Sequence, residues 1–155
     1  IFRLAKYPVT AVEFAVSGTG TAELRTALAT EAAEIGVDVA VVSAGLAPPN
    51  ATNAQLQSMA TKASDVAGTF GEELGGVTNA VAQLMRTGLV KNANEAFDLI
   101  TAGFQSGANK AEDLLDTINE YSTQFRRLGL DGPTAIGLLT QGLKAGARDA
   151  DQVAD

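Results

Sequence analysis

The chain has 155 residues, contains no cysteine, histidine or tryptophan, and carries a formal net charge of −7. This composition excludes disulfides, thiolate nucleophiles, imidazole bases and most kinds of zinc site. Its few basic residues are scattered, which argues against specific nucleic-acid binding, because neutralising phosphates requires clustered Lys and Arg.

Residues 1–47 differ in pattern from the rest of the chain. Residues 8–16 are rich in β-branched side chains and predict a strand, residues 21–35 carry apolar side chains at helical spacing, and residues 37–42 predict a second strand. A strand, a helix and a strand joined by short connections form a βαβ unit. The turn Gly18-Thr19-Gly20 has Glu23 where a dinucleotide-binding loop needs its third glycine, so we expect no cofactor there.

A proline-rich joint at residues 48–52 predicts a domain boundary, because Pro48-Pro49 cannot continue a helix. From residue 53 onward the periodicity is helical, and we expect amphipathic helices punctuated by glycines and by capping residues such as Asn92. The expected ranges are 53–67 (ended by Gly68 and Gly71), 72–86, 92 to about 105, 109–128 as the longest, 133–146, and a last helix from 149. No apolar run approaches the length of a membrane span.

One short unit is written twice between residues 92 and 155. Residues 92–111 align with residues 131–150 at an offset of 39, with seven identities in twenty positions. A period of this size is typical of one helical hairpin per unit, and each hairpin is too small to bury its apolar face alone. If the two units are equivalent, Leu99 and Leu138 are both buried, and Gly103 and Gly142 lie at matching turns or contacts.

No set of residues indicates catalysis, metal binding or cofactor binding, and we name no site residues. The densest acidic cluster, Glu112, Asp113, Asp116 and Glu120, is expected on the solvated face of an amphipathic helix. The spacings Gly103-x-x-x-Gly107 and Gly142-x-x-x-Gly146 match a membrane-helix dimer motif, but their polar flanks favour close helix contacts or hairpin turns. The apolar stripe is expected in the core: Phe97, Ile100, Phe104 and Phe125.

The stretches KYPVTAVEFAVSG (Lys6 to Gly18) and EAAEIGVDVAVVSAGLA (Glu31 to Ala47) lie in the first segment. They resemble the C-terminal half of the ACT regulatory domain of actinobacterial phosphoserine phosphatases. The resemblance implies half of a ferredoxin-like βαββαβ fold, in a domain class that binds small amino acids and dimerises. The phosphatase motif that follows in that family is replaced here by Ala47-Pro48-Pro49-Asn50, so phosphatase activity is not implied.

The stretches AFDLITAGFQSGANKAEDLLDTINEYSTQF (Ala96 to Phe125) and GLLTQGLKAGARDADQVAD (Gly137 to Asp155) lie in the helical segment. They resemble tail tape-measure proteins of siphophages and prophages, and the resemblance extends over about residues 54–155. It implies a structural, non-enzymatic protein of the virion tail that fills the tail tube during assembly, in the host cytoplasm, and sets tail length. It also implies self-association and tail-tube or tail-tip partners.

Together these features predict a mainly α fold of repeated helical hairpins, preceded by a small βαβ, half-ferredoxin-like segment. The expected division is residues 1–47, a linker at 48–52, and a helical region at 53–155. The chain begins at Ile1 and stops inside a predicted helix, so we expect a fragment of a longer protein. A dimerising or amino-acid-sensing ACT-type binding module on a helical scaffold is the alternative function. A natural mosaic, an engineered chimera and a composite sequence are all open.

Overall fold

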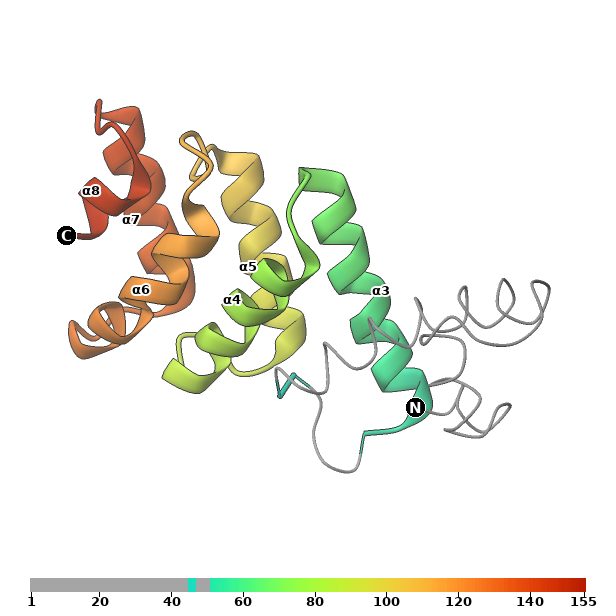
Figure 1. The fold of residues 1–155 in the computed structure, drawn as a ribbon. Coiled ribbons are helices and arrows are strands. Elements are labelled where there is room, and N and C mark those ends of the chain that lie inside the picture. Colours follow the sequence, from blue (N-terminus) through green and yellow to red (C-terminus); the bar gives the residue numbers. More distant parts are fainter. Residues whose placement is uncertain (1–44, 47–50) are drawn as a thin grey trace, which may run out of the picture.

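The computed structural model describes residues 45–46 and 51–155, and within them the chain forms six α-helices (Figure 1). The mainly helical fold class is therefore confirmed, whereas the predicted βαβ segment lies outside the described residues. None of the helices in the described part is long and apolar enough to cross a membrane. The helices are α3 (Asn53–Phe70), α4 (Leu74–Thr87), α5 (Ala93–Ser106), α6 (Leu114–Arg127), α7 (Gly132–Lys144) and α8 (Ala150–Ala154).

Side chains placed one residue before a helix begin most of these elements. The side chains of Asn92, Asp131 and Asp149 each accept a hydrogen bond from the backbone N–H three residues later, at 3.0, 2.9 and 2.8 Å. Thr52 and Gln55 exchange two such bonds in a capping box at the start of α3. Each bond satisfies an amide that the first helical turn leaves unpaired, so the helix starts are specified locally by sequence.

The helices are arranged as three hairpins stacked side by side in two layers. One layer contains α3, α5 and α7, the other contains α4, α6 and α8, and each helix packs on the next member of its own layer (Figure 1). Consecutive helices within a hairpin, α3 with α4 and α7 with α8, also pack on each other. This is the arrangement of an α-solenoid, in which each hairpin contacts only its neighbours.

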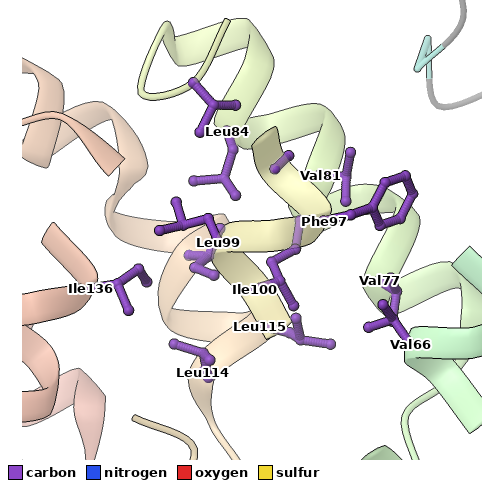
Figure 2. Packing of buried hydrophobic residues seen from close by; sticks show 14 of the residues in the cluster. Val66, Val77, Val81, Leu84, Phe97, Leu99, Ile100, Leu114, Leu115 and Ile136 are labelled. Carbon is purple, nitrogen blue, oxygen red and sulfur yellow. The ribbon is translucent and has the colours of Figure 1, made fainter. Parts of the chain in front are cut away.

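The core runs continuously through the stack rather than closing within one hairpin. Val77, Val81 and Leu84 of α4 face Phe97 and Ile100 of α5, and all five side chains are buried (Figure 2). The same cluster continues into the later helices through Leu114, Leu115, Ile118, Ile136, Leu139 and Leu143. Burial of this apolar area against neighbouring hairpins is the main force that holds the stack together.

The stack contains one more hairpin than the sequence repeat indicates. The pair α3–α4 packs on α5–α6 through α3 on α5 and α4 on α6, and α5–α6 packs on α7–α8 through α5 on α7 and α6 on α8. Its sequence relation to the later units is hidden because small residues carry its contacts, including Ala60, Ala63 and Ala80, which are all buried. The chain therefore has three stacked hairpins with buried contacts, whereas the repeat in residue identity covers only two of them.

Two predicted helix boundaries are wrong. Helix α6 begins at Leu114 rather than at Asn109, and it has 14 residues, whereas α3 with 18 is the longest helix. The connection before it adopts a positive φ of 60° at Glu112, and the Asn109 side chain accepts from the Leu114 amide at 2.9 Å. Gly68 does not break α3, which ends only at Gly71, where φ is 72°.

The prediction that both repeat leucines are buried is wrong for one of them. Leu99 in α5 is 8% exposed, whereas its counterpart Leu138 in α7 is 47% exposed. The two residues occupy the same position of the unit, but α5 has a later hairpin packed over it and α7 is the last long helix of the described stack.

Candidate functional surface

Close contacts at glycines join the two helices of a hairpin in both copies of the repeat. Gly103 in α5 approaches α6 so closely that a Cβ at this position would lie 2.9 Å from Leu114 Cδ2. Gly142 in α7 approaches α8 in the same way, with a Cβ 2.6 Å from either Cγ atom of Val153. Because Leu114 and Val153 are also 39 residues apart, the repeat preserves a contact and not only a sequence.

The second glycine of each unit makes the turn that follows. Gly107 has φ of 90° and Gly146 has φ of 112°, a backbone region that side-chain-bearing residues rarely adopt. The next amides, of Ala108 and Ala147, donate back to the carbonyls of the first glycines at 2.9 and 3.0 Å. The prediction of close helix contacts and hairpin turns for these spacings is confirmed.

Polar bonds connect successive hairpins along the stack. The Gly132 amide at the start of α7 donates to the Leu89 carbonyl at 2.9 Å, and the Ser106 and Thr140 hydroxyls are 2.9 Å apart. Lys62 Nζ donates to Asn94 Oδ1 at 2.8 Å, which joins α3 to the start of α5. These directional bonds fix the register of one hairpin on the next, while the apolar core supplies most of the stability.

The acidic cluster separates into solvated residues and one structural carboxylate. Glu112, Asp116 and Glu120 are exposed, as predicted. Asp113 is half-buried, and its Oδ2 accepts from the amides of Ala150 and Asp151 at 2.8 and 3.1 Å. A carboxylate from α6 therefore sits at the N-terminus of α8, where the helix dipole favours negative charge. The sequence alone does not indicate this role, because the partner amides lie 37 and 38 residues away.

The pKa shifts within the described part follow from these caps and contacts. Hydrogen bonds from the Thr134 side chain and amide hold the pKa of Asp131 below its usual value. The neighbouring Arg148 guanidinium and the Gln152 amide lower the pKa of Asp149. Burial, followed by the charge of Asp151, raises the pKa of Tyr121, which records the contact between α6 and α8.

The aromatic stripe belongs to the core, as predicted. Phe97, Ile100 and Phe125 are buried. Phe104 is partly buried and stacks on Phe70, with ring centroids 4.4 Å apart and planes 12° from parallel. This pair ties the end of α5 to the end of α3, so the aromatic side chains join hairpins instead of lining a ligand pocket.

Among the described residues, no group of three or more His, Cys, Asp or Glu side chains could hold a metal ion. One hollow in this part is an open depression between α5 and α7, lined among others by Leu99, Ser106 and Gln141. The arrangement thus supplies a repeated shape that internal apolar contacts hold together.

Comparison with known proteins connects this architecture to phage tails. The profile of the family described as "Phage-related minor tail protein" matches residues 19–155, a longer range than the predicted resemblance from about residue 54. A protein of Streptomyces phage phiC31 named "Probable tape measure protein" is 58% identical over 93 residues, 60% of this chain and 13% of the relative. A phosphoserine phosphatase of Streptomyces coelicolor is 83% identical over 46 residues, 30% of this chain and 11% of that enzyme.

Both resemblances inferred from the sequence are therefore confirmed. The chain spans well under a fifth of the length of either relative. No solved structure matches the chain.

Proposed function

The chain belongs to the family of phage-related minor tail proteins, and we propose that its helical part is a stacked-hairpin segment of a tail tape-measure protein. The observation that carries the proposal is the 58% identity to the phage phiC31 protein together with the repeating hairpin contact at Gly103 and Gly142. A structural ruler needs a unit that adds the same length each time it is repeated, and a solenoid provides one.

The proposed division places an ACT-like segment at residues 1–47, a linker at 48–52 and the hairpin region at 53–155. The hairpin region acts through shape and contact in the virion tail, during assembly and length determination, with tail-tube or tail-tip proteins as partners. It is not an enzyme in this proposal. The family profile covers 19–155, whereas the similarity to the phosphatase covers 46 residues, so an amino-acid-sensing role is not favoured.

Stacked hairpins predict how much each repeat unit adds to the length of the tail. A 39-residue unit stretched into one continuous helix would span about 58 Å, at a rise of about 1.5 Å per residue. The same unit folded as a stacked hairpin advances the solenoid by about 10 Å, the usual distance between packed helix axes. The close glycine contacts and caps support the folded form, so we expect the smaller contribution to tail length.

Deleting residues 93–131 from the parent phage protein tests the proposal. The deletion joins Asn92 to Gly132, and Asn92 then caps α7 as Asp131 does now. We expect tails shorter by about 10 Å in averaged electron micrographs, and tails longer by the same amount when residues 93–131 are duplicated. Shortening of about 58 Å would indicate that the unit stretches inside the tube. An unchanged tail length in both variants would remove this region from the ruler.

A further inference from the structure

The described residues contain two exposed large hydrophobic side chains, Leu138 (47% exposed) and Leu128 (75% exposed). Leu138 lies on α7 and Leu128 directly follows α6, and α7 and α8 form the end of the stack opposite α3 (Figure 1). We call Leu138, Tyr121 and Leu128 together the end face. Tyr121 on α6 and Leu128 after it line a hollow beside the last residues of α8, and Leu138 lies on α7.

The preceding hairpin shows what covers this surface when a neighbour is present. Leu99, the counterpart of Leu138, is covered by the start of α7, where a Cβ on Gly132 would lie only 2.5 Å from Leu99 Cδ2. The Gly132 amide also donates to the Leu89 carbonyl at 2.9 Å. The leucine of one hairpin therefore packs against the glycine of the next hairpin. Among the described residues, no such glycine packs against Leu138.

The α6 side of the end face has a counterpart in α4. Helix α4 packs against α6, and Leu115 lies 3.5 Å from a Cβ on Gly76. Helix α8 has five residues, and its end reaches α6 near Tyr121. A hollow lies between the two helices there, lined by Tyr121, Gln124, Arg127 and Leu128 on one side and by Ala154 and Asp155 on the other.

We propose that the end face is a docking surface for a further helical hairpin of the same repeat, carried by the same polypeptide after α8. Continuity with the α5–α7 interface is the main support, because the end face repeats the surface that α7 already covers. A second copy of the chain fits less well, since the described exposed residues of α3 on which it would dock are mostly polar, including Gln57, Ser58, Thr61, Ser64 and Asp65.

The register of this further hairpin follows from the repeat. Val153 already fills the place on Gly142 that Leu114 fills on Gly103. Asp155 is the counterpart of Asp116, since 116 + 39 = 155, and both are aspartate. A second copy of residues 117–155 appended directly after Asp155 therefore continues α8 in the register of α6 and supplies another α7-like helix. Such an extended chain presents to the end face the surface that α7 presents to α5.

Hydrogen exchange of the 155-residue chain and of the extended chain tests the proposal. We expect the amides of α7 to exchange at least tenfold more slowly in the extended chain, and helix content to rise in circular dichroism. Leu138→Asp is expected to abolish this slowing in the extended chain while leaving α7 exchange nearly unchanged in the 155-residue chain. Thr123→Asp, at an exposed position outside the hollow, is the matched control and is expected to preserve the slowing.

Three results would overturn the proposal. The first is unchanged α7 exchange in the extended chain. The second is an appended copy that stays unfolded, because the end face would then fail to template a hairpin identical to the one already docked on α5. The third is a dimer of the 155-residue chain in light scattering that Leu138→Asp dissociates, which would assign the end face to a second copy.

Discussion

The hairpins α5–α6 and α7–α8 are two copies of one unit in different surroundings. The caps of α5 and α7, the close glycine contacts and the left-handed turns coincide at an offset of 39 residues, whereas α6 and α8 start at different positions of the unit. Burial also differs between the two hairpins, because α5 has neighbours on two sides and α7 has a described neighbour on one. Local structure in this chain is therefore set by the unit, and burial at a given position is set by the next hairpin.

The largest expected effect contrasts the two repeat leucines. Leu99→Ala removes a buried side chain that packs under the start of α7, and we expect it to lower the free energy of unfolding by about 2–5 kcal/mol. Leu138→Ala removes a half-exposed side chain, and we expect a loss below about 1 kcal/mol. Urea denaturation of both variants measures the difference. Equal losses would contradict the distinction between the inner and the end hairpin.

Two glycines of α7 are expected to respond differently to substitution by alanine, because only one of them lies against the preceding hairpin. A Cβ on Gly132 would meet Leu99 Cδ2 at 2.5 Å and the Leu89 carbonyl oxygen at 3.0 Å, so Gly132→Ala is expected to cost about 1–3 kcal/mol. A Cβ on Gly137 would meet no atom within 4 Å. Because alanine favours helix over glycine, Gly137→Ala is expected to stabilise by about 0.5–1 kcal/mol. Thermal unfolding that ranks the two variants in the opposite order would refute the interface at Gly132.

The carboxylate that joins the two hairpins gives a smaller effect. Asp113→Ala removes the acceptor for the amides of Ala150 and Asp151, and we expect it to lower stability by about 1 kcal/mol. Exchange of those two amides should become faster while exchange in α5 stays unchanged. Asp116→Ala, at an exposed position three residues away, is the control and is expected to change stability by less than about 0.5 kcal/mol.

The smallest effect concerns the caps of the two units, Asn92 and Asp131. The pKa of Asp131 lies below its ordinary value of 3.8 in the folded chain, because Thr134 donates to its carboxylate. A lowered folded pKa means that the contribution to stability is complete above the unfolded pKa and is lost as pH falls through the folded one. Asn92 does not titrate. We therefore expect Asp131→Asn to flatten the loss of melting temperature below about pH 4 and to change little at pH 7. An unchanged acid limb would contradict the cap's role.

The sequence predicts the local part of this fold well. Helix caps and turns can be recognised in the sequence because their hydrogen-bond partners lie within a few residues. Examples are the caps Asn92, Asp131 and Asp149 and the turns at Gly107 and Gly146. Helix periodicity also identifies the apolar stripe, because one face of each helix must be buried.

Two missed features depend on distant partners. The exposure of Leu138, unlike Leu99, depends on whether a later hairpin covers it, and the role of Asp113 depends on Ala150. The start of α6 at Leu114 depends on local bonds and on the positive φ of Glu112. The hairpin α3–α4 was not predicted as a copy of the unit, because its contacts use small residues that carry little sequence signal. The absence of a catalytic set of residues stays a prediction. The candidate functional surface is formed by several hairpins together, so no single stretch of sequence indicates it.

Native-state hydrogen exchange on the 155-residue chain tests the central claim, that each hairpin is stabilised by its neighbours. Buried amides in the middle of α5, around Ile100, are predicted to exchange at least tenfold more slowly than the equivalent amides around Leu139 in α7, although both side chains are almost completely buried. Equal protection at the two positions would contradict the claim, because it would mean that each unit is stabilised by its own contacts alone.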